Sequence, residues 1–114
     1  MVIKRGEIWW GQIPFPRGSE PGYSRPLVVV SADTFNRSAI HTVVVLALTR
    51  DLGRENAPGN VRLSRRDSGP PHASVANVSQ LMTLDKCMLT VRVKRIPPPI
   101  MQRIDDGLRL ALAR

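Results

Sequence analysis

Two apolar runs joined by a short polar connection constrain this chain more than any other feature. Residues 26–31 and 43–49 are rich in valine and leucine, and residues 32–41 between them suit a turn or one short helical turn. Continuous apolar runs are typical of strands buried on both faces. Antiparallel pairing about the middle of the connection, near Arg37, would place Arg25 opposite Thr49. A cation and a hydroxyl would then meet at one sheet edge, between two long polar loops, which favours a functional site over packing.

The charge balance indicates an anionic partner. The 114 residues include 17 basic and 9 acidic side chains, a formal net charge of +8, and fourteen of the basic side chains are arginine. Arginine grips phosphate through a planar fork and stacks on bases. Nucleic acid is therefore the first expectation, and simple solubility is the alternative. The sequence shows no basic amphipathic helix, so a membrane surface is a less favoured partner.

The length suits a single domain spanning residues 1–114, with enough apolar content for a core of its own. Cys87 is the only cysteine, so no intramolecular disulfide can form, and a small buried side chain is its expected role. The N-terminal segment lacks the apolar core of a signal peptide, and no run approaches the length of a membrane span. A cytoplasmic protein with no membrane partner is expected.

Short strands followed by one terminal helix make up the rest of the pattern. Three prolines at residues 97–99 break the chain before a helix. Its apolar stripe should consist of Ile100, Ile104, Leu108, Ala111 and Leu112. Further strands are predicted at residues 7–13, 61–63, 74–81 and 89–94. The fold class is thus mainly β: a small, strongly bent barrel capped by a C-terminal helix.

Several local details can also be predicted. Asp33 is expected to be the N-cap of a helical turn in the connection. Trp9 and Trp10 are adjacent on a strand, so they should face opposite sides, with one in the core. Gly107 inside the terminal helix costs about 1 kcal/mol, which packing must offset. One face of the last strand should carry Leu89, Val91 and Val93.

The spacing of ligand-type residues does not match a metal or cofactor site. His41 and His72 are 31 residues apart, and no carboxylate lies four positions from either. The glycines fit neither a P-loop nor a dinucleotide motif. Asp105 and Asp106 are adjacent and point in different helical directions, which argues against a two-metal nuclease. No metal and no cofactor is expected.

RNA cleavage without a metal fits the residues at the Arg25/Thr49 edge. The RNA 2′-hydroxyl attacks the neighbouring phosphate and the 5′-oxygen leaves. The protein must orient the attack, neutralise the phosphorane and assist two proton transfers. Arg25 can supply charge and donors but is a poor general base. Thr49 can hydrogen-bond a phosphate oxygen, and Glu20 in the first polar loop could serve as the base.

Each of these residues also has a structural interpretation. Arg25 could be a solvated loop residue, and the Thr49 hydroxyl could bond backbone at a strand end. On these grounds alone, an ordinary loop carboxylate is favoured for Glu20. Other residues of the two loops could bind RNA, with Tyr23 stacking on a base and two arginines supplying charge. The loop candidates are Ser19, Tyr23, Arg50 and Arg54.

Four segments, taken together, match one known family. They are residues 4–10 (KRGEIWW), 18–26 (GSEPGYSRP), 45–49 (VLALT) and 80–85 (QLMTLD). On these motifs the chain resembles the MazF/PemK family of toxin endoribonucleases, the mRNA interferases of type II toxin–antitoxin systems, from about residue 3 to 112. The arginine of the family's Arg-Pro motif falls on Arg25, its catalytic threonine on Thr49 and its loop glutamate on Glu20.

The resemblance implies an SH3-like barrel of the CcdB/MazF type that assembles as a homodimer. It implies metal-independent cleavage of single-stranded RNA, mRNA first, to 2′,3′-cyclic phosphate and 5′-hydroxyl ends. A cognate MazE-type antitoxin would neutralise it through an acidic C-terminal segment. Gln80 opens the last motif and joins the expected RNA-binding residues. The family often has a basic residue where this chain has Met82, so one groove contact to RNA could differ.

Two other functions remain open from the sequence. The same fold resembles CcdB-type toxins, which bind DNA gyrase and cleave nothing, and fold alone does not settle function. A plain basic RNA-binding module would also suit the charge. The facing positions of Arg25 and Thr49 favour the nuclease, because neither alternative needs that pair.

Overall fold

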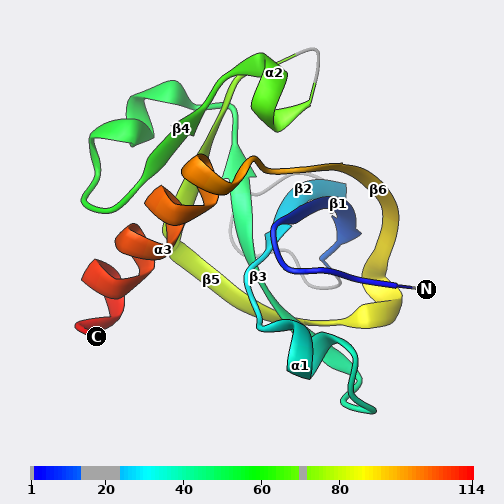
Figure 1. Cartoon of the computed structure of the whole chain (residues 1–114). Helices are drawn as coiled ribbons and strands as arrows, with labels where there is room; N and C mark the ends of the chain where they lie inside the picture. The colour runs from blue at the N-terminus through cyan, green and yellow to red at the C-terminus, as the bar shows by residue number, and fades with distance from the viewer. Residues whose placement is uncertain (1, 14–23, 70–71) are drawn as a thin grey trace.

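The computed structural model describes residues 2–13, 24–69 and 72–114, in which six antiparallel strands form one strongly curled sheet (Figure 1). The strand order is β4-β5-β3-β2-β1-β6. The strands are β1 (Glu7–Gln12), β2 (Ser24–Val29), β3 (Thr42–Thr49), β4 (Val61–Leu63), β5 (Ser74–Asp85) and β6 (Leu89–Arg95). The helices are α1 (Asp33–Asn36), α2 (Arg65–Ser68) and α3 (Pro98–Leu112), with 3-10 turns η1 (Leu52–Asn56) and η2 (Lys86–Met88). The predicted mainly-β fold with a C-terminal helix is confirmed.

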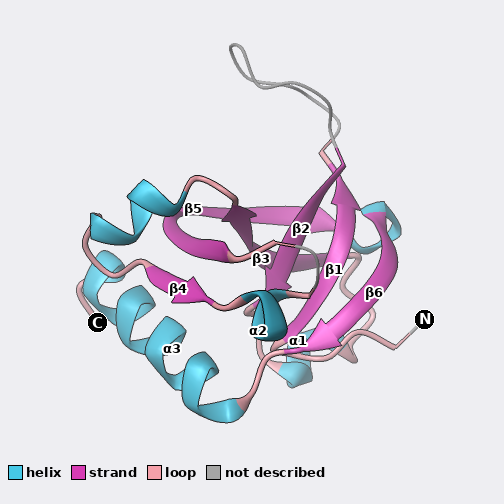
Figure 2. Ribbon diagram, turned by 90° about the horizontal axis from the view of Figure 1, so that it is seen from above, coloured by secondary structure: helices cyan, strands magenta, loops and turns pink. Residues whose placement is uncertain are grey.

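The strands β2 and β3 lie between two hydrophobic cores, as their continuous apolar sequences predicted. Val28 and Leu46 belong to a first core, which α3 and β4 cover. Leu27 and Val29 belong to a second core, which the curl of the sheet encloses. All four side chains are fully buried. Figure 2 shows this arrangement, with β1, β2 and β6 on one side of the curl and α3 and β4 on the other.

The long strand β5 is bent, and it pairs with both β3 and β4. Its second half pairs with the start of β3, with Leu81 opposite Leu46, whereas its first half pairs with the end of β3, with Ala76 opposite Leu48. Residues 77–80 interrupt the ladder between these pairs, so β5 gains twist and reaches β4. The predicted strand ended at residue 81, whereas β5 continues to Asp85 because residues 82–85 pair with the start of β3.

The last strand, β6, does not carry its three apolar residues on one face, so that prediction was wrong. The pairing with β1 shifts twice, at Thr90 and at Val93. Such a bulge moves the following side chains to the other face. Leu89 therefore packs in the second core and Val93 against the first, while Val91 is exposed.

Two local predictions fail and one holds. Helix α1 begins at Asp33 itself with Ala32 as N-cap, because the Asp33 carboxylate accepts the Arg5 N–H at 2.7 Å instead of capping the helix. Cys87 lies exposed in the turn η2 rather than buried. The two tryptophans face opposite sides as predicted: Trp9 is buried and Trp10 is 41% exposed.

Helix α3 covers the first core with Met101 and Ile104, which are both buried. The predicted stripe is wrong at its end, since Ala111 and Leu112 are exposed. The helix extends beyond the sheet there, so its last turn has little of this chain to pack against (Figure 1). No helix in the described ranges is both long and apolar enough to cross a membrane.

Candidate active site

The register of β2 and β3 is the one that the sequence predicted. Leu27 pairs with Ala47, which corresponds to pairing about Arg37. The pairing ends at Leu27 and Ala47, and Arg25 and Thr49 each lie two residues beyond it, where β2 pairs with β1 and β3 pairs with β5. Arg25 and Thr49 therefore lie at the same ends of two neighbouring strands, which is compatible with the predicted pair.

Arg25 is a strand residue and not a loop residue. It is half-buried, and it pairs across the sheet with Gly11 of β1. A Cβ on Gly11 would lie 2.5 Å from the Leu27 side chain, so glycine is needed for the second core to close beneath this edge. The backbone of Arg25 therefore lies next to the well-packed second core.

Thr49 is the last residue of β3 and pairs with Val75 of β5. Its Oγ1 accepts the backbone N–H of Asp51 at 3.1 Å. The expected structural role of the hydroxyl is therefore present. A hydroxyl that accepts one hydrogen bond keeps its own proton to donate. This bond orients Thr49 and is compatible with a donor role toward a phosphate oxygen.

The second polar loop is more ordered than its sequence suggested, because it contains η1. The Asp51 side chain caps this turn by accepting the Gly53 N–H at 3.2 Å, a short-range contact that an Asp two residues before a glycine could have predicted. Arg54 Nε lies 3.6 Å from Asp51 Oδ2, and both side chains are more than half exposed. Exposed pairs of this kind are weak, so Arg54, like the exposed Arg50, remains able to turn toward a phosphate.

Gln80 is not close to Thr49 in sequence, whereas Arg50 and Arg54 follow Thr49 within five residues. It is half-buried in the bend of β5, next to Leu81, which faces Leu46. Leu46 is three residues from Thr49 along β3, which corresponds to about 10 Å. Met82 packs against the second core, so its side chain points into the protein.

The remaining predicted site residues are Ser19, Glu20 and Tyr23. All three lie outside the described residues, and their roles stay predictions. No cluster of three or more His, Cys, Asp or Glu side chains suited to a metal ion occurs among the described residues.

A buried carboxylate lies at the other end of β1. Burial raises the pKa of Glu7, but bonds from the Lys4 N–H, from Arg92 and from Trp9 together hold its pKa below the usual value. Glu7 Oε2 lies 2.5 Å from Arg92 Nε. A carboxylate with these partners ties β1 to β6 and is structural.

Comparison with known proteins places the chain in a family. Residues 4–112 match the model of the PemK-like, MazF-like toxins of type II toxin–antitoxin systems. Endoribonuclease MazF6 of Mycobacterium tuberculosis is 39% identical over 112 residues, which is 98% of each chain. Endoribonuclease EndoA of Bacillus subtilis is 30% identical over 113 residues, covering 99% of this chain and 97% of that protein.

Solved structures show the same fold. A mycobacterial endoribonuclease in complex with its cognate antitoxin superposes with a TM-score of 0.79 at 24% identity, covering 97% of this chain and 95% of that chain. MazF from Deinococcus radiodurans gives a TM-score of 0.77 at 19% identity, with 100% and 99% coverage. The fold and the edge described above define a small curled-sheet protein with a basic, hydroxyl-bearing rim. With these matches, the chain belongs to the PemK/MazF toxin family of type II toxin–antitoxin systems.

Proposed function

We propose that this protein is a toxin endoribonuclease that cleaves single-stranded RNA, chiefly mRNA, without a metal. The observation that supports the proposal is the register of β2 and β3, which puts Arg25 and Thr49 at the same ends of two neighbouring strands. Membership of the family and relatives named endoribonucleases support the same activity. The products would be a 2′,3′-cyclic phosphate and a 5′-hydroxyl.

In this mechanism the RNA supplies the nucleophile and the protein stabilises the transition state. Arg25 donates to the non-bridging oxygens of the scissile phosphate and neutralises the charge of the phosphorane. Thr49 donates its hydroxyl proton to the same phosphate and orients it for in-line attack. Glu20 is the candidate base that takes the proton of the 2′-hydroxyl, and Arg25 or water supplies the proton with which the 5′-oxygen leaves as a hydroxyl. Arg50 and Arg54 add charge that binds the flanking phosphates.

The test is incubation of the protein with a single-stranded RNA in EDTA, followed by analysis of the fragment ends. We expect cleavage with 5′-hydroxyl ends, and no cleavage by the Arg25→Ala variant. Intact RNA together with tight binding to DNA gyrase would contradict the proposal in favour of a CcdB-like toxin. RNA binding without cleavage would favour a plain binding module.

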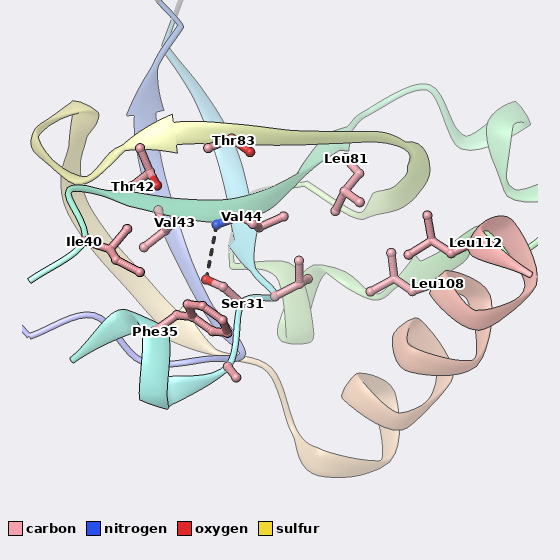
Figure 3. A pocket seen from close by; sticks show the side chains of 12 residues that line it. Ser31, Phe35, Ile40, Thr42, Val43, Val44, Leu81, Thr83, Leu108 and Leu112 are labelled. Carbon is pink, nitrogen blue, oxygen red and sulfur yellow. Dashed lines mark hydrogen bonds between the residues drawn. The ribbon is translucent and has the colours of Figure 1, made fainter. Parts of the chain in front are cut away.

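The homodimer that we propose uses an apolar groove beside α1. The groove has a volume of about 470 Å³ and lies between α1, β3, the second half of β5 and the end of α3 (Figure 3). Phe35 and Leu112 line it and are 56% and 53% exposed. Exposed apolar side chains gathered in one concave patch are typical of protein interfaces. A second copy at this groove would cover them.

Two leucines at the end of α3 make a matched test of this interface. Leu112 lines the groove, whereas Leu110 is 63% exposed and does not belong to its lining. Sedimentation should give a mass of two chains for the wild type and for Leu110→Glu. Leu112→Glu should shift the protein to monomer, because a carboxylate would be buried at the interface. A dimer in Leu112→Glu that is as stable as wild type would place the interface elsewhere.

The antitoxin that we propose as partner occupies the Arg25/Thr49 edge with an acidic C-terminal segment. Carboxylates would stand where RNA offers phosphates, so inhibition would be competitive and sensitive to salt. The net charge of +8 supports this complementarity. An antitoxin peptide should displace labelled RNA from the protein at physiological ionic strength. Simultaneous, independent binding of peptide and RNA would contradict direct occlusion.

A further inference from the structure

The side-chain amide of Asn60, at the end of the second polar loop, connects this loop with β5. Asn60 Nδ2 donates to the backbone carbonyl of Arg54 at 2.9 Å. Asn60 Oδ1 accepts the backbone N–H of Val78 at 3.0 Å. The amide therefore connects η1, which carries Arg54, with the bend of β5, which carries Gln80. Neither contact could be predicted from the sequence, because the partners of Asn60 lie six and eighteen residues away.

A contact between two glycines holds the same end of the loop on α3. Gly59 has a φ of +80°, in the left-handed region that favours glycine. A Cβ on Gly107 of α3 would lie 2.0 Å from the Gly59 carbonyl oxygen. A Cβ at either glycine would also approach the Val78 side chain, at 3.0 Å from Gly59 and 3.2 Å from Gly107. The cost of a glycine inside α3 is thus offset by direct packing of the loop on the helix backbone.

These contacts fix the loop at both ends. At its start, Thr49 belongs to the ladder with Val75 of β5. At its end, Gly59 and Asn60 hold it on α3 and on the bend of β5. Arg54 lies between these anchors, and its exposed ion pair with Asp51 is too weak to position it alone. Binding groups that are held in place before the ligand arrives lose less conformational entropy on binding.

We propose that Asn60 is a positioning residue for RNA binding. It fixes the separation of Arg54 from Gln80 and so sets the affinity for the RNA segment that flanks the cleaved phosphate. The proposal rests on the proposed endoribonuclease function. It leaves the chemistry to Arg25 and Thr49, which the sheet positions independently of Asn60. Loss of Asn60 should therefore raise KM and leave kcat almost unchanged, since binding shared by ground and transition states affects KM alone.

The experiment compares Asn60→Ala and Asn60→Asp with a matched control, Asn56→Ala. Asn56 is an exposed asparagine in η1, and its side chain makes none of the hydrogen bonds found within the described ranges. Steady-state cleavage of an RNA oligonucleotide gives KM and kcat. Trypsin digestion after Arg54 and hydrogen exchange at the Val78 amide report the two bonds without reference to RNA.

For Asn60→Ala we expect a KM about fivefold to tenfold higher, corresponding to loss of one to two hydrogen bonds, with kcat within about twofold. Trypsin cleavage after Arg54 and exchange at Val78 should both become faster. Asn60→Asp keeps an acceptor for the Val78 N–H but cannot donate to Arg54. It should share the KM and trypsin effects while retaining slow exchange at Val78. Asn56→Ala should match the wild type.

Failure of this inference is distinguishable from failure of the proposed function. A wild-type protein that leaves RNA intact would contradict the endoribonuclease function. A cleaving Asn60→Ala variant with wild-type KM would overturn the positioning role. So would a fall in apparent kcat at unchanged KM, because that pattern reports loss of folded protein and nothing more.

Discussion

The two ends of the β2–β3 pair use their polar side chains differently. At the α1 end, Asn36 is buried and donates from Nδ2 to the Ser31 carbonyl at 2.9 Å, while Ser31 Oγ donates to Asn36 Oδ1 at 2.6 Å and accepts the Val44 N–H. Lys86 donates to the Asn36 carbonyl from across the structure. The connection between the strands is thereby locked to the sheet.

At the other end, the bonds of Thr49 and Asp51 stay within the loop that follows β3. The hydroxyl proton of Thr49 and the charges of Arg50 and Arg54 are placed at the rim. At the α1 end, the polar side chains thus hold the connection to the backbone of the strands. At the other end the bonds are confined to one loop and two arginines stay exposed, which is the arrangement expected when a rigid scaffold presents a site on its loops.

The largest effect should come from Arg25. Arg25→Ala removes a preorganised donor and a charge at the phosphorane, so kcat should fall about 100-fold to 1000-fold. Arg25→Lys should recover little, because an ammonium cannot reproduce the guanidinium fork. Single-turnover cleavage measures both, with circular dichroism as the control for folding. A folded Arg25→Ala variant of near wild-type rate would remove Arg25 from the mechanism.

Thr49 should have the next largest effect. Thr49→Val keeps the shape and β propensity of the side chain but removes the hydroxyl, and kcat should fall about 100-fold. Thr49→Ser restores the hydroxyl and should recover most of the rate. Equal rates for Thr49→Val and wild type would reduce Thr49 to its bond with Asp51.

At the α1 end, substitution should affect stability and not catalysis. Asn36→Ala leaves the Ser31 carbonyl and hydroxyl without their buried partner, so the free energy of unfolding should fall by about 2–3 kcal/mol. Urea unfolding checks this value, and kcat at a temperature where the variant is folded should equal that of wild type. Loss of cleavage in folded Asn36→Ala would show that the two ends are coupled.

The smallest effect should be the acid sensitivity of the α1 end. The bond from the Arg5 N–H, with help from Asn36, holds the pKa of Asp33 below its ordinary value of 3.8. A carboxylate with a lowered pKa stabilises the fold above its unfolded pKa, and this contribution is lost as pH falls below 3.8. Asp33→Asn should therefore be less stable than wild type at pH 7. The difference in urea midpoint should shrink toward pH 3, and a difference that grows would contradict the assignment.

Much of the fold could be predicted because its signals are local. The apolar runs of β2 and β3 and their short connection predicted the register in which Leu27 pairs with Ala47. The helical spacing after three prolines placed α3. These features depend on residues close in sequence, whose patterns follow directly from strand and helix geometry.

The remainder depends on contacts between distant residues. The bulge at Thr90 turned Val91 outward, and pairing of residues 82–85 with β3 extended β5 beyond its predicted end. The sequence did not explain the glycine at position 107, which packs against Gly59 in the structure. It also did not indicate the hydrogen-bond partners of Asn60. Such features are determined by packing between distant residues, and a local sequence pattern does not predict them.

The central claim is that Arg25 and Thr49 act on one phosphate at one edge of the sheet. Single-turnover rates of Arg25→Ala, Thr49→Val and the double variant test this directly, with wild type as reference. Residues that act as a unit show non-additive losses, so the double variant should be little slower than the slower single variant. Losses that multiply in full would mean that the two residues act independently, and would contradict the account.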